Sequence, residues 1–209
     1  MKLKKIYLFD LDGVLIDSKK NMQLSWNELS VKNNINVPFS NYFSLIGLPF
    51  IQILKKLKIK QKYFKKIEYD FKTNSIKNLK YIKIHKGVLK TLKILKKKKK
   101  IVGILTSKER IRTLKILSKF NIKVDLVLCP YRNLIGKPNP KQINDLAKKI
   151  RVSKEKIVYI GDMKVDKLTA KNAKVDYIHA NYGYNKNVKS KYLIKNIYDI
   201  VRLNFGIDK

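Results

Sequence analysis

The stretch Ile6-Tyr-Leu-Phe-Asp10-Leu-Asp12-Gly13-Val-Leu15 places two carboxylates, two residues apart, at the end of an uninterrupted apolar run. Such a run is typical of a parallel strand buried on both faces, and ligands of open α/β sheets bind at the carboxyl ends of these strands. Because residues i and i+2 of an extended chain project to the same side, Asp10 and Asp12 can converge on one hard cation. Taken alone, the pattern is better explained by a strand followed by an Asp-Gly turn, so the rest of the chain must decide.

Length and composition are those of a folded globular protein. The chain has 209 residues, of which 44% are hydrophobic, enough for one large domain or a core with a small insertion. Cys129 is the single cysteine, which excludes an intramolecular disulfide and predicts a reducing, cytoplasmic location. The apolar run that ends at Phe9 is too short for a signal peptide, and no other segment approaches a membrane span. We therefore expect a soluble, intracellular protein without membrane association.

The chain is strongly basic, with 49 Lys and Arg against 15 Asp and Glu and a net charge of +34. Nucleic-acid binding is one interpretation of this excess. However, only five of the basic residues are arginine, the residue that base-reading and phosphate-clamping surfaces favour. The lysines are spread over every predicted helix and include the run at 96–100. We interpret them as solvated compositional bias that binds nucleic acid at most non-specifically, although a positive field attracts small phosphorylated anions.

Apolar runs and amphipathic segments alternate along most of the chain. Residues enriched in β-branched and aromatic side chains predict strands at 4–9, 100–105, 125–128, 157–161 and 175–180. Helical spacing predicts helices at 87–98, 108–119, 139–150, 163–173 and 189–203. This alternation predicts an α/β fold with a doubly wound, mainly parallel sheet. Residues 17–84 show only helical periodicity, which predicts a small inserted α-helical domain, with residues 1–16 and 85–209 forming the core.

Three further polar sites fall at or beyond the ends of predicted strands. Thr106 and Ser107 follow one strand and precede a helix, an arrangement that suits an anion but is equally typical of a helix N-cap. Lys137 lies in the rigid sequence Gly-Lys-Pro-Asn-Pro, unlike most of the other lysines. Asp162 follows a strand and is four residues from Asp166, so the two share one helix face if the helix begins near Asp162. Considered without the other sites, Asp162 and Asp166 are also explained as an N-terminal helix cap.

Together, the order and spacing of these four sites resemble the motifs of the haloacid dehalogenase (HAD) superfamily. The first motif is Asp10-Leu-Asp12-Gly-Val-Leu, the second is Thr106, the third is Lys137 in Gly-Lys-Pro-x-Pro, and the fourth is Gly-Asp162-x-x-x-Asp166. The helical segment between the first two motifs resembles the C1-type cap of that superfamily. Its loop Gly47-Leu48-Pro49-Phe50 resembles the cap loop of phosphoglycolate-phosphatase-like members, as does the later Asn-Tyr-Gly-Tyr sequence at 181–184.

The resemblance implies a catalytic mechanism for the two aspartates of the first motif. Asp10 is expected to attack phosphorus and form an aspartyl-phosphate. Asp12 is expected to protonate the leaving oxygen and then to deprotonate the attacking water. Repulsion between two neighbouring carboxylates helps to keep one of them protonated.

The resemblance also implies roles for the other motif residues. Mg²⁺ is the expected cofactor, held by Asp10, the backbone carbonyl of Asp12 and Asp162, with Asp166 supporting the metal site. Thr106, the following amide at Ser107 and Lys137 are expected to bind the phosphoryl oxygens. The cap loop, from Gly47 to Phe50, is expected to select the substrate.

Departures from related patterns narrow the expected reaction. Hydrolytic dehalogenases lack the second aspartate of the first motif, so the presence of Asp12 favours phosphoryl transfer. β-Phosphoglucomutases carry a histidine and an arginine at positions that correspond here to Met22 and Phe50, which makes a mutase the weaker alternative. His85 and His179 lie away from the motifs and are interpreted as structural.

The sequence therefore predicts a Mg²⁺-dependent phosphatase that acts on a small phosphorylated metabolite, resembling phosphoglycolate or a sugar phosphate. Two alternatives stay open: a phosphosugar mutase on the same scaffold, and a basic nucleic-acid-associated protein that has lost catalysis. We expect a monomer or weak dimer. The identity of the substrate depends on side chains of the inserted segment, which contain no diagnostic signature.

Overall fold

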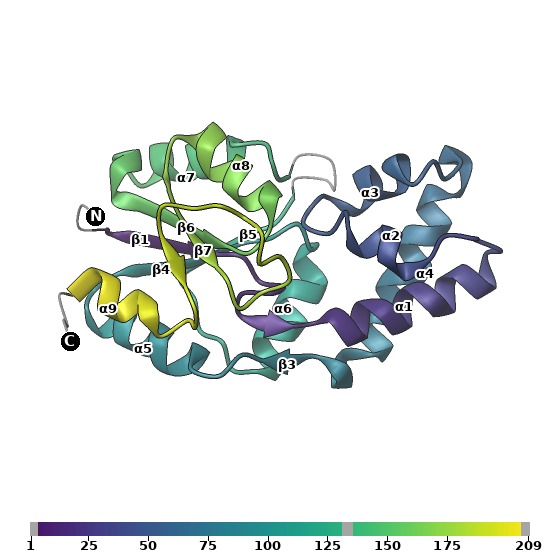
Figure 1. The fold of residues 1–209 in the computed structure, drawn as a ribbon, viewed down its shortest axis with the longest axis horizontal. Helices are drawn as coiled ribbons and strands as arrows, with labels where there is room; N and C mark the ends of the chain where they lie inside the picture. The colour runs from purple at the N-terminus through teal and green to yellow at the C-terminus, as the bar shows by residue number, and fades with distance from the viewer. Residues whose placement is uncertain (1–3, 131–135, 206–209) are drawn as a thin grey trace.

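A six-stranded parallel sheet forms the centre of the computed structural model, which describes residues 4–130 and 136–205 (Figure 1). The strand order is β5-β4-β1-β6-β7-β8, and every neighbouring pair is parallel. The strands are β1 (Ile6–Phe9), β4 (Ile101–Leu105), β5 (Leu126–Leu128), β6 (Ile157–Gly161), β7 (Asp176–Ala180) and β8 (Leu193–Ile194). The five predicted strands are confirmed, and β8 is an additional one.

The central position of β1 explains its uninterrupted apolar sequence. All four of its side chains are fully buried, and they alternate between the two faces of the sheet. Tyr7 and Phe9 pack in one apolar cluster with residues of α5 (Val88–Lys97), α6 (Arg110–Lys119) and α9 (Asp199–Phe205). Ile6 and Leu8 pack in the opposite cluster with α7 (Lys141–Lys149) and α8 (Lys164–Ala173). Helices thus cover both faces, as the doubly wound prediction requires (Figure 1).

The predicted helix over 189–203 is wrong for most of its length. Its middle forms β8 instead, because the edge of β7 offers unpaired backbone groups: Asn181 donates its backbone N–H to the carbonyl of Ile194. The helix begins only at Asp199, whose carboxylate accepts hydrogen bonds from the backbone N–H groups of Lys195 and Asn196. The apolar spacing in this segment reflects burial against the sheet and not helical periodicity.

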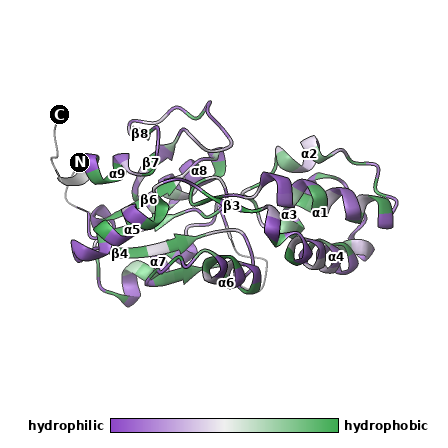
Figure 2. Ribbon diagram, turned by 90° about the horizontal axis from the view of Figure 1, so that it is seen from below, coloured by the Kyte–Doolittle hydropathy of each residue, from purple (hydrophilic) through white to green (hydrophobic). Residues whose placement is uncertain are grey.

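Four helices with an apolar core of their own lie between β1 and α5 in the sequence. They are α1 (Lys19–Lys32), α2 (Phe39–Phe43), α3 (Phe50–Lys56) and α4 (Phe64–Lys77). Trp26 is fully buried in this core and stacks on Tyr42 with a centroid distance of 4.6 Å. Figures 1 and 2 show that this helical insertion lies beside the sheet as a separate lobe. Short 3-10 helices, at Gln61–Tyr63, Leu79–Tyr81 and Lys154–Lys156, complete the helical elements of the described residues.

A two-stranded antiparallel sheet lies where the chain enters and leaves the helical insertion. It consists of β2 (Ile16–Asp17) and β3 (Lys83–Ile84), with Ile16 opposite Ile84. The sequence predicts no strand at this point, and that expectation is wrong. Two-residue strands are too short to show an alternation of apolar and polar side chains, so only the pairing of two distant segments reveals them.

The lysine-rich surface follows from the amphipathic helices (Figure 2). In α5, for example, Val88, Leu92 and Leu95 are buried, whereas Lys93 and Lys96 are exposed. Across residues 4–130 and 136–205, the model contains no helix with both the length and the apolar character that crossing a membrane requires.

Candidate active site

Three buried carboxylates meet at the carboxyl end of the parallel sheet. Asp10 follows β1, Asp162 follows the adjacent strand β6, and Asp166 lies in the first turn of α8. Each contributes one oxygen such that the three oxygens lie within 4.8 Å of one another. The three residues are at most 3% exposed. Parallel strands end on the same side of the sheet, which is why two distant sequence motifs meet here.

Asp166 is the most thoroughly hydrogen-bonded of the three carboxylates. One oxygen accepts from the Lys137 ammonium at 2.7 Å and from the Tyr159 hydroxyl at 2.8 Å. The other accepts from the backbone N–H groups of Asp162 and Met163. Because both oxygens are engaged by protein donors, the geometry suits a residue that positions its neighbours.

Among the described residues, Asp162 has one oxygen without a hydrogen-bond partner. Its Oδ2 accepts from the backbone N–H of Tyr184 at 2.7 Å, whereas no donor in residues 4–130 and 136–205 reaches its buried Oδ1. Two glycines make room for this carboxylate. A Cβ on Gly13, whose φ is +84°, would lie 2.2 Å from Asp162 Oδ2, and one on Gly183 would lie 2.4 Å from Asp162 Cβ. An unpartnered buried carboxylate oxygen is costly unless a ligand satisfies it.

Lys137 supplies the positive charge that faces these carboxylates. Its ammonium lies 3.0 Å from Asp10 and 2.7 Å from Asp166, and the residue is 1% exposed. Burial lowers the pKa of Lys137, but the charges and hydrogen bonds of Asp10 and Asp166 have the larger combined effect and raise it. Lys137 therefore stays protonated. Burial is the main cause that raises the pKa of Asp10, and the charges of Asp166 and Asp12 add to it although Lys137 opposes it. The cluster thus contains three carboxyl groups and one ammonium, so its full ionisation would leave an excess of negative charge.

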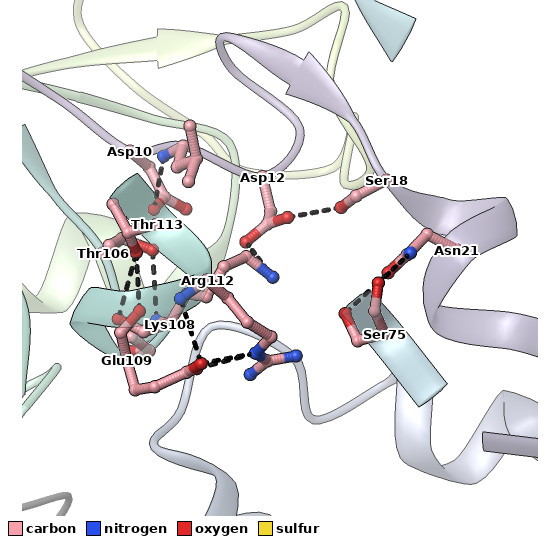
Figure 3. A network of polar contacts seen from close by, with 12 residues as sticks. Asp10, Asp12, Ser18, Asn21, Ser75, Thr106, Lys108, Glu109, Arg112 and Thr113 are labelled. Atoms are coloured by element: carbon pink, nitrogen blue, oxygen red, sulfur yellow. Dashed lines mark hydrogen bonds and ion pairs between the residues drawn. The ribbon is translucent and has the colours of Figure 1, made fainter. Parts of the chain in front are cut away.

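Asp12 lies beside this cluster and not within it. Its Oδ1 accepts a hydrogen bond from the Ser18 hydroxyl, and its Oδ2 lies 3.3 Å from the Lys108 ammonium. Its side chain is 19% exposed, whereas that of Asp10 is 5% exposed. Figure 3 shows that the Asp12 carboxylate lies between α6 and the start of α1. The side chain is thus placed for proton transfer toward the cavity rather than for membership of the carboxylate cluster.

Thr106 and Ser107 follow β4, the other neighbour of β1. Thr106 is buried, and its hydroxyl accepts the backbone N–H of Lys108 at 3.2 Å (Figure 3). The Ser107 hydroxyl donates to the carbonyl of Gly47, so it connects the sheet to the helical insertion. The sequence grouped Ser107 with the phosphate-binding residues and gave no indication of this contact.

A partly open cavity of about 50 Å³ lies between these residues and the helical insertion. The sheet side contributes Asp10, Asp12, Thr106, Ser107 and Lys137. Of the predicted cap loop, Gly47, Leu48 and Phe50 line the cavity, and Pro49 lies next to it, in contact distance of Gly136. Gly47 is required there because its φ is +93° and a Cβ would lie 2.5 Å from Val165 Cγ1. Since one water needs about 10–15 Å³ of such space, the cavity holds only a few waters or a small ligand.

Sequence reasoning missed several residues that line or support the cavity. Lys108, Arg112 and Tyr42 line it, and Tyr159 and Tyr184 orient its carboxylates. The signals available were weak: Lys108 is two residues beyond Thr106, and Arg112 is a rare arginine in a lysine-rich chain. His85 and His179 do not line the cavity. The ring of His179 instead packs in the core, 3.1 Å from the Tyr177 hydroxyl.

Comparisons with known proteins agree with this architecture. The model of the haloacid dehalogenase-like hydrolase family matches residues 7–180. The chain is 25% identical to a phosphoglycolate phosphatase of Haemophilus influenzae over 88% of each chain. It is also 25% identical to the pyrophosphatase PpaX of Halalkalibacterium halodurans, over 93% of this chain and 94% of the other.

Solved structures show the same fold. A hydrolase from Pseudomonas syringae superimposes with a TM-score of 0.84 at 22% identity, covering 99% of this chain and 100% of the other. A haloacid dehalogenase-like family protein from Streptococcus pneumoniae gives a TM-score of 0.82 at 15% identity, covering 97% and 99%. With a family match over most of its length, and with the four motifs at one end of the sheet, the chain belongs to the haloacid dehalogenase-like hydrolase family.

Proposed function

We propose that this protein is a Mg²⁺-dependent phosphatase that hydrolyses a small phosphorylated metabolite through an aspartyl-phosphate on Asp10. The observation that carries the proposal is the cluster of Asp10, Asp162 and Asp166, three buried carboxylates that face Lys137 beside the cavity that Asp10 and Lys137 line. Relatives named phosphoglycolate phosphatase and pyrophosphatase support phosphoryl chemistry for this chain.

The carboxylate cluster fits a hard divalent cation. The unpartnered Oδ1 of Asp162 and the excess negative charge both favour a cation with oxygen ligands. Asp10, Asp162 and the backbone carbonyl of Asp12 would hold Mg²⁺, and Asp166 would orient the site through its hydrogen bonds. When bound, the ion neutralises carboxylate and phosphoryl charge, which allows the anionic substrate to approach an anionic nucleophile.

The reaction then proceeds in two displacements at phosphorus. In the first, an Asp10 oxygen forms a bond to phosphorus, the ester bond breaks, and Asp12 gives its proton to the leaving oxygen. In the second, Asp12 removes a proton from water, the water oxygen attacks phosphorus, and the bond to Asp10 breaks to release phosphate. Thr106 and Lys137 lie beside Asp10 in the cavity and bind the phosphoryl oxygens in both steps.

The helical insertion, which we assign to residues 17–84, acts as a cap that closes over the cavity and excludes bulk water. Its loop from Gly47 to Phe50 faces the substrate and contributes to specificity. Met22 and Phe50 are apolar cavity walls, so at those positions the chain lacks the histidine and arginine expected of a mutase.

The proposal is tested by measuring phosphate release from a panel that includes phosphoglycolate, pyrophosphate and sugar phosphates, with and without Mg²⁺. The wild-type protein is expected to hydrolyse at least one of them, and Asp10→Asn, which keeps the shape of the side chain but cannot attack phosphorus, is expected to abolish turnover. Circular dichroism checks that the variant is folded. Retained turnover in a folded Asp10→Asn protein would falsify the assignment of the nucleophile.

A further inference from the structure

Arg112, on α6, has a guanidinium that the protein leaves partly unsatisfied. Its Nε donates to both oxygens of Glu109, at 2.8 and 2.7 Å, and its Cζ lies 5.2 Å from the centroid of the Phe71 ring. The residue is only 5% exposed, and its buried Nη1 has no hydrogen-bond partner within the part of the chain that the structure describes. Glu109 and Phe71 therefore fix the orientation of the guanidinium while one nitrogen stays available.

The Arg112 side chain lines the cavity that contains Asp10. Lys108 also lines this cavity, and Figure 3 shows Arg112 on α6 and Lys108 just before that helix. Both cations form an ion pair, Lys108 with Asp12 and Arg112 with Glu109. They differ in that Nη1 of Arg112 has no hydrogen-bond partner among the described residues. A buried N–H group without a partner is destabilising, and a bound acceptor removes that penalty.

The identity of the residue points to an anion. The chain uses lysine for 44 of its 49 basic residues, yet it places an arginine here. A guanidinium offers several fixed donors that match the oxygens of a carboxylate or a phosphate, which an ammonium does not. Phe50, Phe71 and Leu48, which also line the cavity, are apolar and offer no partners for the several hydroxyls of a sugar.

We propose that Arg112 binds a second anionic group of the substrate, and that the preferred substrates are compact phosphoryl compounds bearing a carboxylate or a second phosphate. The inference rests on the proposed phosphatase function and names the substrate class for that site. Thr106 and Lys137 bind the phosphoryl group that is transferred, and Arg112 binds the group that leaves with the product.

The kinetic test compares matched substrates that differ in the second anion. Phosphoglycolate is paired with ethyl phosphate, and pyrophosphate is paired with methyl phosphate, so the two arms distinguish a carboxylate from a phosphate. The wild-type protein should prefer the member with the second anionic group in at least one arm. In Arg112→Met, kcat/KM for that member should fall by roughly 10- to 100-fold more than for the partner that lacks this group, the range expected for a hydrogen bond to a charged group. Arg112→Lys should recover part of the difference.

The matched control is Arg110→Met, which removes an exposed arginine from the same helix outside the cavity and should not change the ratio between paired substrates. A binding assay separates this inference from the proposed function. In Mg²⁺, calorimetry should show that 3-phosphonopropionate, which is not hydrolysed, binds more tightly than propylphosphonate, and that Arg112→Met reduces this difference.

Failure of hydrolysis with all substrates, together with this binding preference, would reject the phosphatase proposal and keep the anion site. The anion site is rejected if the wild-type protein shows no preference, in any arm, for the compound with the second anionic group. It is also rejected if Arg112→Met folds but its kcat/KM falls by the same factor for both members of each pair, since that result assigns Arg112 a structural role. If Arg112→Met does not fold, the anion site is judged from the substrate preferences of the wild-type protein and of Arg112→Lys.

Discussion

The hydroxyl of Ser107, at the end of β4, donates a hydrogen bond to the carbonyl of Gly47 in the helical insertion. This contact joins two parts of the chain that have separate apolar cores, and it lies at the edge of the cavity. Gly47 also packs closely against Val165, so its loop lies against the sheet side at two points. We expect the contact to stabilise the insertion in this position against the sheet.

Ser107→Ala removes this hydrogen bond and should favour the open arrangement. Because a typical net hydrogen bond is worth about 1 kcal/mol, we expect kcat/KM to fall roughly fivefold. Steady-state kinetics measures the effect, and Ser118→Ala on the exposed part of α6 serves as the control. An unchanged kcat/KM would show that this contact does not contribute to closure.

Asp12→Asn tests the assigned acid and base. The amide keeps the shape of the side chain but cannot exchange a proton, so turnover should fall by roughly 10²- to 10⁴-fold. Rapid-quench measurements with labelled substrate should show that the slow release of the leaving group limits formation of the aspartyl-phosphate. A loss of less than tenfold would assign the proton transfers to another group.

Removal of Mg²⁺ should affect both activity and stability. Excess EDTA should stop turnover and added Mg²⁺ should restore it. Since Mg²⁺ binds only the folded protein in this proposal, a concentration 100 times the Kd should raise the unfolding free energy by about 2.7 kcal/mol. Thermal unfolding measures this, and Asp162→Ala should shift the Mg²⁺ titration to higher concentrations. An identical titration in that variant would remove Asp162 from the ligand set.

Asp70 of α4 gives the helical insertion a pH-dependent stability. Burial alone would raise the pKa of Asp70, but hydrogen bonds from Lys32 and Asn33 and the charges of Lys32 and Lys66 outweigh burial and lower it. The carboxylate form is therefore stabilised by folding, a contribution present above the unfolded pKa of about 3.9 and lost as the pH falls through the lower folded value.

Accordingly, Asp70→Asn should reduce the free energy of unfolding by roughly 1.5–3 kcal/mol at neutral pH, the range for hydrogen bonds to a charged group. The difference in unfolding free energy between Asp70→Asn and the wild-type protein should shrink as the pH falls below the folded-state pKa of Asp70. Urea unfolding at pH 7 and near pH 3 measures both. Asp145→Asn, which breaks an exposed pair with Lys141, is the control and should cost well under 1 kcal/mol. A pH-independent loss in Asp70→Asn would contradict the ionic explanation.

The lysine excess predicts weak nucleic-acid binding without sequence preference. Such binding rests on counterion release, so its affinity should fall steeply and linearly with salt on a logarithmic scale. Fluorescence anisotropy with unrelated oligonucleotides of equal length measures the slope. Selective binding of one sequence at physiological salt would support the alternative of a nucleic-acid-associated protein.

The sequence alone determined the sheet and the polar residues at its end. The buried run that ends in Asp10 could only be a central strand, and turn residues after the other apolar runs marked where each strand stops. Local patterns suffice here because a parallel strand covered on both faces needs a continuous apolar sequence. The same patterns placed Thr106 and Asp162 at strand ends and Lys137 in a loop beyond one, and the parallel topology brings these residues together.

Only the tertiary structure decided what depends on contacts between distant segments. The edge of β7 converts residues 193–194 from an expected helix into a strand, and β2 pairs with β3 across the whole helical insertion. The structure also separates Asp12 from the carboxylate cluster and brings Arg112 into the cavity. These outcomes follow from hydrogen bonds and packing between residues far apart in the chain, which no local periodicity encodes.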